Sequence, residues 1–360
     1  MSQAEIALGV VGCGTIGGYW LDHFASQLSL ASQTRVTALF RSSQALVTPR
    51  GIDVSRWRQL FAEQAEQSDK NRILRWIQAS QERGQQTVLL DLTAAKSISR
   101  AYVDWFKAGA HVISANKYAG SSGVDTYQEL QRVQQQYQRT WLYNTTVGAG
   151  LPILSAIAER CRCGDGILRV EGNLSGSLSW IFQNYRSGDA LSQWLLKARD
   201  LGLTEPDPRT DLGGMDVARK LVILAREAGW SLQLRDVAIH NLVPKSLQDC
   251  STEEFLADLT AFDQAFDDWR ATQDANAEQW VYLGYIERTA DGGVRAGTEL
   301  VPIAAESSYA RLPAGNANFT VRSQQYDANP LIIQGPGAGP EVTAAGVHSD
   351  VLQLIGQLRK

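Results

Sequence analysis

The chain has 360 residues, enough for two domains with a substantial core. Its formal net charge of −4 provides no basic field for nucleic acid. No apolar run approaches the roughly 20 residues of a membrane span, and the start MSQAEIALGV lacks the basic region of a signal peptide, so we expect a cytoplasmic protein. The four cysteines fit no disulfide framework or zinc site, and we expect reduced thiols.

The chain opens with a short apolar run, IALGVV, followed by a glycine-rich turn and a helical stretch from Tyr19 to Leu28. Such glycines also serve plain turns, but a strand before them and a helix after them are the context of a dinucleotide-binding loop. In that loop a pyrophosphate approaches the glycine backbone and rests on the N-terminus of the helix. The predicted cofactor contacts are Gly12, Gly14, Thr15, Ile16 and Gly17.

The next predicted strand, RVTALF, ends in Arg41-Ser42-Ser43. An acidic residue at this place binds the ribose 2′-hydroxyl of NAD, whereas an arginine can clamp the 2′-phosphate of NADP. A solvated surface arginine is the alternative reading. Arg41 therefore favours NADP as cofactor and leaves NAD possible.

Residues 44 to 86 are polar and rich in glutamine, and we predict a helical insertion on the outside of the sheet. Strands and helices then alternate through TVLLDLT, a helix at 97–108, HVIS, a helix at 125–138 and TWLY. This alternation predicts an α/β domain with a Rossmann-like, doubly wound parallel sheet, spanning residues 1–145.

Ligands of such sheets bind beyond the carboxyl ends of the strands. Thr93 and Asn116-Lys117 follow two of the predicted strands, so Thr93 and Lys117 are candidate cofactor contacts. A lysine at a strand end is more often a plain surface residue. A role for Lys117 needs further support, which comes from the resemblance described below.

From about residue 146 the pattern changes, because strands follow one another without intervening helices. Three of them read WVYLGYIE, GVRAGTEL and ANFTVRS. Such runs predict a second, α+β domain with an open sheet over residues 146–330. A final strand, glycine loop and helix are predicted at 331–360. The family resemblance described below implies that this segment returns to the nucleotide domain. The expected helices of the second domain span residues 152–162, 178–186, 190–200 and 253–271.

The densest group of charges lies in GLTEPDPRTDLGGMDVARK, residues 202–220, just before the apolar helix LVILAREAG. Asp216 and Lys220 are four residues apart on one helix edge, and an isolated pair of this kind is commonly a surface ion pair. Here Glu205 and Asp211 bring two more carboxylates close to the start of the same helix. The additional carboxylates indicate a substrate whose ammonium group binds carboxylates and whose reacting oxygen takes a proton from a lysine.

This segment closely resembles the signature of homoserine dehydrogenases, nearest to the dehydrogenase half of the bifunctional, type II-like aspartokinase–homoserine dehydrogenases. The resemblance continues through HVISANKYAG, WLYNTTVGAGLP, LSGSLSWIF and GPGAGPEVTAAG. It implies NADP(H)-dependent interconversion of L-aspartate 4-semialdehyde and L-homoserine, a step of threonine and methionine biosynthesis, by direct hydride transfer. It also implies a homodimer or higher homo-oligomer, formed through the second domain.

The resemblance implies a role for each polar residue of the site. Lys220 would act as general acid or base, and Lys117 would add positive charge near the reacting oxygen. Asp216 would order the active-site lysine and, with Glu205 and Asp211, contribute to substrate binding. Which lysine gives the proton stays open. Further cofactor contacts are implied at Lys117, Gly202, Gly337 and Gly339.

A glycine-rich loop, Asn144 to Pro152, joins the two predicted domains. Family members bind a monovalent cation such as sodium here, largely through backbone carbonyls. Many members have a carboxylate where this chain has Asn144, and the amide lacks its charge attraction. A plain hinge loop is the alternative. The matching ligand positions are Asn144, Val147, Ala149 and Leu151.

An inactive NADP-binding sensor or scaffold on the same fold would keep the glycines and lose the acid–base residues. This chain keeps Lys117 and Lys220 together with the three carboxylates, which favours an enzyme. Aldehyde oxidation through a cysteine thiohemiacetal would need an activated cysteine with a histidine base, and the sequence shows no such signature. The sequence does not distinguish a free-standing enzyme from part of a bifunctional chain.

Overall fold

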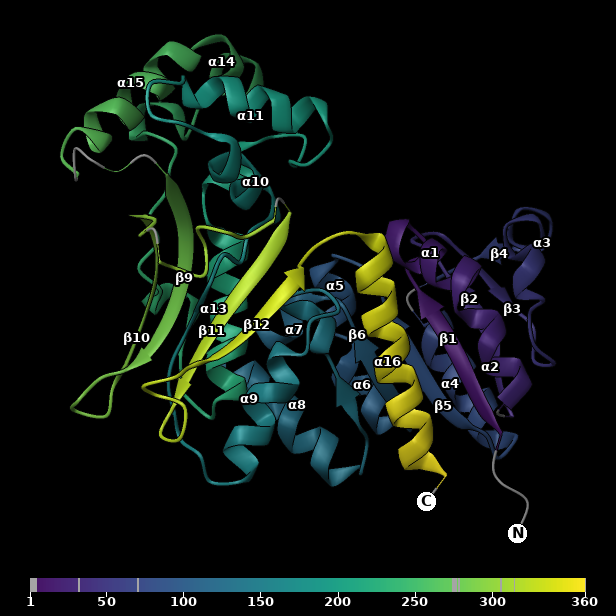
Figure 1. The fold of residues 1–360 in the computed structure, drawn as a ribbon. Coiled ribbons are helices and arrows are strands. Elements are labelled where there is room, and N and C mark those ends of the chain that lie inside the picture. Colours follow the sequence, from purple (N-terminus) through teal and green to yellow (C-terminus); the bar gives the residue numbers. More distant parts are fainter. Residues whose placement is uncertain are drawn as a thin grey trace. The chain divides into compact units, whose positions relative to one another are not determined.

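A computed structural model describes residues 5–31, 33–69, 71–273, 277, 279–304, 306–313 and 315–359 (Figure 1). The chain divides into two compact units. One contains Met1–Gly150 and Gly339–Lys360, and the other contains Leu151–Ala338. Among the described residues, no helix combines the length and the apolar character needed to cross a membrane.

The first unit is built on a seven-stranded sheet with the order β4-β3-β2-β1-β5-β6-β7. Five neighbouring strands run parallel, and helical segments connect them in sequence. The prediction of a Rossmann-like, doubly wound domain is therefore confirmed. The parallel strands are β1 (Ile6–Val11), β2 (Thr34–Phe40), β5 (Gln86–Asp91), β6 (Ala110–Ser114) and β7 (Trp141–Leu142).

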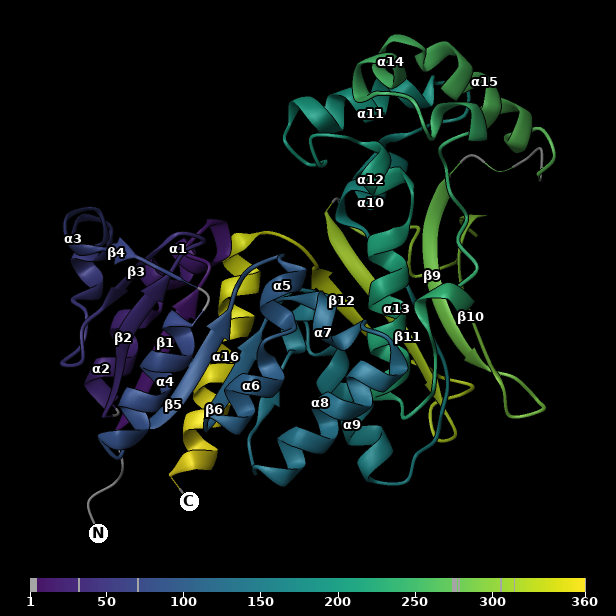
Figure 2. The same cartoon turned by 180° about the vertical axis from the view of Figure 1, so that it is seen from behind.

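Helices cover both faces of this sheet, which explains why β1 is apolar along its whole length (Figure 1 and Figure 2). Leu8 packs on one face with Trp20 and Val347, and Val11 packs on the other face with Trp76. The first face carries α1 (Thr15–His23), α2 (Ala25–Ala31) and α16 (Pro340–Leu358). The second face carries α4 (Arg72–Glu82), α6 (Tyr102–Lys107) and α8 (Val124–Gln136), and short helices α5 (Lys96–Ser99) and α7 (Lys117–Gly120) precede α6 and α8.

The stretch 44–86 differs from the all-helical insertion that the sequence predicts. It contains two short strands that extend the sheet, because β3 pairs antiparallel with β2 and β4 pairs with β3. The polar composition of the stretch conceals the apolar run Ala45-Leu46-Val47, whose first two residues are buried. The elements are β3 (Gln44–Val47), η1 (Val54–Arg56), α3 (Trp57–Gln64) and β4 (Glu66–Gln67), followed by α4.

His111 of β6 makes the stability of the first unit depend on pH. It is 3% exposed, and its Nδ1 accepts the backbone N–H of Thr140 at 3.0 Å. Burial, assisted by the charge of Arg139, lowers the pKa of His111 to about 4. Because the folded state disfavours the protonated ring, His111 contributes its full stability above the unfolded pKa and loses it as the pH falls from about 6.5 to about 4.

We expect His111→Asn to remove this dependence, because an amide oxygen can still accept the Thr140 N–H and does not titrate. Denaturant unfolding of both proteins at pH 7 and pH 4 measures the effect. Wild type should lose about 2–3 kcal/mol more free energy of unfolding than the variant when the pH is lowered from 7 to 4. Parallel pH profiles would show that His111 is not the titrating group.

The second unit contains a five-stranded antiparallel sheet with the order β10-β9-β8-β11-β12. Helices α10 and α13 pack on β9, where a Cβ at Gly284 would lie 2.7 Å from Leu174 and from Val217. The glycine therefore lets α13 approach the sheet closely. The strands are β8 (Ile167–Gly172), β9 (Trp280–Arg288), β10 (Val294–Pro302), β11 (Asn316–Ser323) and β12 (Leu331–Pro336). The helices include α9 (Ile153–Arg162), α10 (Gly176–Asn184), α11 (Leu191–Asp200), α13 (Met215–Glu227), α14 (Thr252–Ala257) and α15 (Leu259–Arg270).

The C-terminal segment 331–360 does not return to the nucleotide domain as a whole. Its strand, β12, pairs antiparallel with β11 and completes the sheet of the second unit. Only α16 packs in the first unit, against α1, with Val347, Val351 and Leu354 in the core. The backbone pairing of β12 and the apolar face of α16 thus have partners in different units.

Candidate active site

Two glycines of the turn between β1 and α1 differ in the space that is available for a side chain. A Cβ at Gly17 would lie 2.0 Å from the carbonyl oxygen of Gly12, whereas a Cβ at Gly14 would meet nothing within 4 Å. Gly14 is the N-cap of α1, and no side chain caps this helix. The first N–H groups of α1 are therefore oriented to receive an anion, and Gly14 leaves room for it.

A pocket of about 830 Å³ lies at the carboxyl ends of β1, β2 and β5. Three predicted cofactor residues line it: Gly12, Arg41 and Thr93. The stretch 44–86 also contributes to its wall, contrary to the expectation that it only covers the outside of the sheet. Additional lining residues that the sequence did not reveal include Ser42, Ser68, Asn71, Leu74 and Arg100.

Arg41 follows the end of β2 and is exposed at this pocket. Its guanidinium carbon lies 4.7 Å from the centre of the Phe61 ring, so α3 supports the side chain. The neighbouring thiol of Cys13 is buried, and burial raises its pKa to about 11. Cys13 is therefore protonated at neutral pH and unsuited to nucleophilic chemistry.

The carboxylate of Asp91, at the end of β5, connects two predicted site residues. It is fully buried and accepts hydrogen bonds from the Thr93 hydroxyl at 2.7 Å and the Asn116 amide at 2.9 Å. Burial raises the pKa of Asp91. Asn116 also caps α7 through the N–H of Tyr118, and Lys117 is the first residue of that helix. Asp91 thus fixes Thr93 and the backbone at Lys117 relative to each other.

The loop that begins at η2 (Asn144–Thr146) packs against α16 within the first unit. Asp350 of α16 accepts the backbone N–H of Asn144 at 3.3 Å, and burial raises the pKa of this carboxyl to about 7. The hydroxyl oxygen of Thr145 is buried and has no hydrogen-bond partner among the described residues. Val147 and Ala149 are buried, and Ala149 has a φ of 54°. Leu151 begins the second unit.

In the second unit, the predicted pair Asp216 and Lys220 forms an ion pair of 2.8 Å at the start of α13. Lys220 also donates to the carbonyl oxygen of Leu174 at 2.7 Å, and its side chain is only 14% exposed. This carbonyl follows β8 and is distant in sequence. The lysine is therefore held in a fixed, largely desolvated position, unlike a lysine in a surface ion pair.

The two remaining predicted residues, Glu205 and Asp211, are in contact through the backbone of Glu205. One oxygen of Asp211 accepts the backbone N–H of Glu205 at 2.9 Å, and the other accepts the hydroxyl of Ser177 at 2.7 Å. Burial, with a smaller effect of the charge on Asp216, raises the pKa of Asp211. The sequence indicated Ser177 only as part of LSGSLSWIF, without a role.

The family resemblance also implies cofactor contacts at three further glycines. Gly202 lies in an exposed turn after α11 with a φ of 70°. A Cβ at Gly337 would lie 2.3 Å from the Cβ of Ala317, so this glycine permits close packing on β11. Gly339 is the N-cap of α16 and has a φ of 110°. These positions explain the glycines by backbone geometry, and their cofactor contacts stay predictions.

The first unit thus combines a Rossmann-like sheet with an open helix N-terminus, and the second unit holds a largely desolvated lysine beside the Asp216 carboxylate. The family model described as homoserine dehydrogenase, NAD binding domain, matches residues 12–144. The model described as homoserine dehydrogenase matches residues 152–352. The chain belongs to the homoserine dehydrogenase family, whose members are NAD(P)-dependent oxidoreductases.

Individual relatives agree with this assignment. A chloroplastic bifunctional aspartokinase/homoserine dehydrogenase 1 of Arabidopsis thaliana is 38% identical over 98% of this chain, which covers only 39% of that protein. A homoserine dehydrogenase of Paracoccidioides brasiliensis is 32% identical over 99% of this chain and 100% of its own length. The structure of a hyperthermophilic archaeal homoserine dehydrogenase in complex with NADPH shares the fold, with a TM-score of 0.74, 17% identity and 98% of each chain covered.

Proposed function

We propose that this chain catalyses the NADP(H)-dependent interconversion of L-aspartate 4-semialdehyde and L-homoserine, a step in the formation of threonine and methionine. The observation that carries the proposal is the position of the Lys220 ammonium group, which lies between the carbonyl of Leu174 and the carboxylate of Asp216. An inactive sensor or scaffold has no need for a desolvated proton donor held beside the Asp216 carboxylate.

In the proposed reaction, Lys220 donates a proton to the carbonyl oxygen of the aldehyde and takes it back in the reverse direction. Asp216 and the Leu174 carbonyl orient its ammonium group. Asp211 and Glu205 bind the ammonium group of the substrate, and Ser177 fixes the Asp211 carboxylate. Lys117 adds positive charge that stabilises the developing alkoxide. Bound NADPH supplies the hydride when it is present.

The pocket of the first unit fits a dinucleotide, because Gly14 leaves the N-terminus of α1 open and Arg41 stands at the pocket wall. We propose that NADP is preferred over NAD, since a guanidinium can bind a 2′-phosphate through two charge-assisted hydrogen bonds. Arg100, the C-cap residue of α5, lines the same pocket and adds a second positive charge.

We expect Arg41→Ala to weaken NADP binding by about 1–3 kcal/mol, the scale of hydrogen bonds to charged groups, and to leave NAD binding nearly unchanged. Fluorescence titration of the reduced cofactors measures both affinities. Arg132→Ala is a suitable control, because that arginine pairs with Glu129 on the exposed side of α8. Equal losses for the two cofactors would assign Arg41 a purely structural role.

We further propose that the loop from Asn144 to Leu151 binds a monovalent cation through the backbone carbonyls of Val147, Ala149 and Leu151. Two buried groups support this proposal: the Thr145 hydroxyl, which has no hydrogen-bond partner among the described residues, and the carboxyl group of Asp350. Both offer oxygen atoms that can bind a cation at this loop. Melting in sodium chloride and in choline chloride at equal ionic strength tests this proposal. Equal melting temperatures in the two salts would argue against the site.

The decisive test of the proposed function is NADP reduction by the purified chain with L-homoserine, repeated with NAD. Homoserine-dependent absorbance at 340 nm is expected, with a lower KM for NADP. Tight NADPH binding without turnover would instead support the sensor or scaffold. Light scattering of the same sample tests the predicted homodimer, for which we propose the second unit as the contact.

A further inference from the structure

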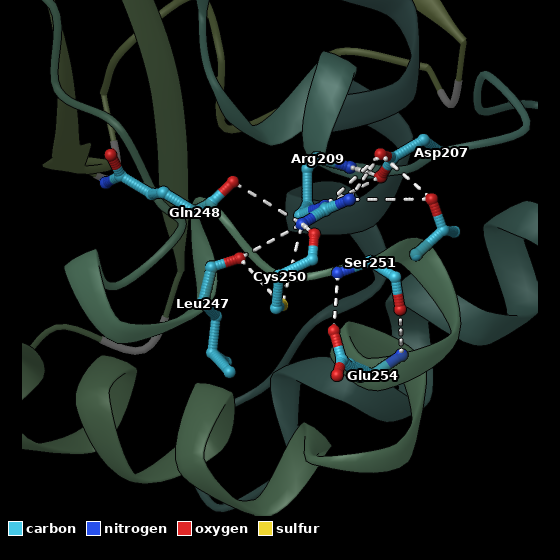
Figure 3. A network of polar contacts seen from close by, with 8 residues as sticks. Asp207, Arg209, Leu247, Gln248, Cys250, Ser251 and Glu254 are labelled. Carbon is cyan, nitrogen blue, oxygen red and sulfur yellow. Dashed lines mark hydrogen bonds and ion pairs between the residues drawn. The ribbon is translucent and has the colours of Figure 1, made fainter.

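The loop that presents Glu205 and Asp211 is tied down by Arg209, the first residue of α12 (Arg209–Leu212). The side chain of Arg209 is 14% exposed. Its Nε and Nη2 atoms donate to the two oxygens of Asp207, at 3.0 and 2.7 Å (Figure 3). The backbone N–H of Arg209 donates to the same carboxylate at 3.0 Å. Asp207 and Arg209 therefore form one rigid, bidentate pair within the loop.

The other side of the guanidinium faces a distant part of the same unit. Nη1 donates to the backbone carbonyls of Cys250 at 2.5 Å and Leu247 at 3.2 Å (Figure 3). The hydroxyl of Thr252 donates to Asp207 at 3.1 Å. The pair thus connects the loop to the segment between η4 (Lys245–Leu247) and α14.

This segment is itself well fixed. Ser251 caps α14 in a capping box, in which its backbone N–H donates to Glu254 at 2.7 Å and its hydroxyl accepts the N–H of Glu254 at 3.1 Å (Figure 3). The guanidinium carbon of Arg209 lies 5.5 Å from the centre of the buried Phe255 ring. Arg209 therefore attaches the loop to a firm support.

The rest of the loop has little apolar attachment. Leu201 and Leu203, which precede Glu205, are 59% and 42% exposed. Leu212, at the end of α12, is buried, so packing holds the loop at that end. Between these points Pro208 is also buried. Its packing and the polar contacts of Asp207 and Arg209 together determine where the carboxylates lie.

We infer that Arg209, together with Asp207, is a positioning residue that holds Glu205 and Asp211 where they bind the substrate. The inference rests on the proposed function for the identity of the substrate, but the ordering of the loop can be measured independently. The side chain of Arg209 forms no hydrogen bond with Glu205 or Asp211, so it is not itself one of the proposed substrate-binding residues. It acts through α12, whose backbone places Asp211 against Ser177 and the N–H of Glu205.

Loss of the guanidinium removes the donor from the carbonyls of Leu247 and Cys250 and two of the donors from Asp207. Only the Thr252–Asp207 hydrogen bond of this network then still joins the loop to the segment 247–252, so the two should be held together much more weakly. A lysine has no planar fork and cannot reach the carboxylate and the carbonyls together. Arg209→Ala should therefore release the loop, and Arg209→Lys should release it partly. The matched control is Arg270→Ala, because Arg270 is a half-buried arginine of the same unit that bonds Ser187 and Asp267.

Hydrogen–deuterium exchange of the full chain tests the ordering of the loop. In Arg209→Ala, peptides that cover residues 203–213 and 244–252 should exchange at least about tenfold faster than in wild type, and Arg270→Ala should leave them unchanged. If Arg209→Ala does not fold, Arg209→Lys supplies the same comparison. Unchanged exchange in residues 203–213 would overturn the inference.

Steady-state kinetics on the same proteins tests the link to substrate. Arg209→Ala should raise KM for homoserine about 10- to 100-fold, while the NADPH dissociation constant stays within about twofold. Asp207→Asn should act through the same contacts, so that the double variant is no worse than Arg209→Ala alone. An unchanged KM for homoserine, in a protein whose loop does exchange faster, would also overturn the inference. A wild type without homoserine turnover would contradict the proposed function, and the exchange experiment would still decide whether Arg209 orders the loop.

Discussion

Lys220→Ala should reduce kcat by 10²- to 10⁴-fold, the typical contribution of a positioned general acid, and leave NADPH affinity nearly unchanged. The reason is the geometry of the ammonium group, which is held between Asp216 and the Leu174 carbonyl in the second unit. The nucleotide pocket belongs to the first unit. Rapid-mixing or steady-state assays with homoserine measure the rate, and fluorescence titration measures NADPH binding.

Lys220→Gln separates proton transfer from packing. The amide can still donate to the Leu174 carbonyl, but it has no proton to transfer at neutral pH, so it should be as slow as Lys220→Ala while retaining more stability. Lys197→Ala is the control, since Lys197 is exposed on α11 and stacks on Trp194. Turnover by either Lys220 variant within about threefold of wild type would remove Lys220 from the mechanism.

Local patterns in the sequence were sufficient for the residues that act through short-range geometry. The glycine spacing after IALGVV predicts a turn between strand and helix, and this turn lies between β1 and α1. The four-residue spacing of Asp216 and Lys220 predicts their neighbourhood on α13, and the two form an ion pair. The ion pair depends only on the periodicity of one helix, and the glycine turn depends only on the short connection between neighbouring elements.

Contacts between distant segments were not accessible in this way. The Leu174 carbonyl that binds Lys220 comes from the connection between β8 and α10, and the Ser177 hydroxyl that binds Asp211 comes from the first turn of α10. No periodicity in the sequence indicates which loop approaches α13. The same holds for Asn71 and Leu74, which reach the nucleotide pocket because two short strands, hidden in a polar stretch, extend the sheet beyond β2.

The second large effect is expected at the glycine turn, where two similar substitutions should fail for different reasons. Gly17→Ala places a Cβ 2.0 Å from the backbone oxygen of Gly12, and neither backbone can move without separating α1 from β1. Overpacking of this kind typically destabilises by about 1–3 kcal/mol or more, so we expect a lower melting temperature and little NADPH binding.

Gly14→Ala should leave the melting temperature nearly unchanged, because its Cβ meets no atom within 4 Å. That empty space is where the pyrophosphate is expected to approach the backbone, so NADPH affinity should still fall at least about tenfold. Thermal melting without cofactor, followed by fluorescence titration with NADPH, distinguishes the two variants. Gly356→Ala in α16, where a Cβ also meets nothing within 4 Å, is the control. It should leave NADPH affinity unchanged and keep or slightly raise the melting temperature, because alanine favours the helix. If Gly14→Ala binds NADPH as tightly as wild type, the pyrophosphate does not lie at the N-terminus of α1.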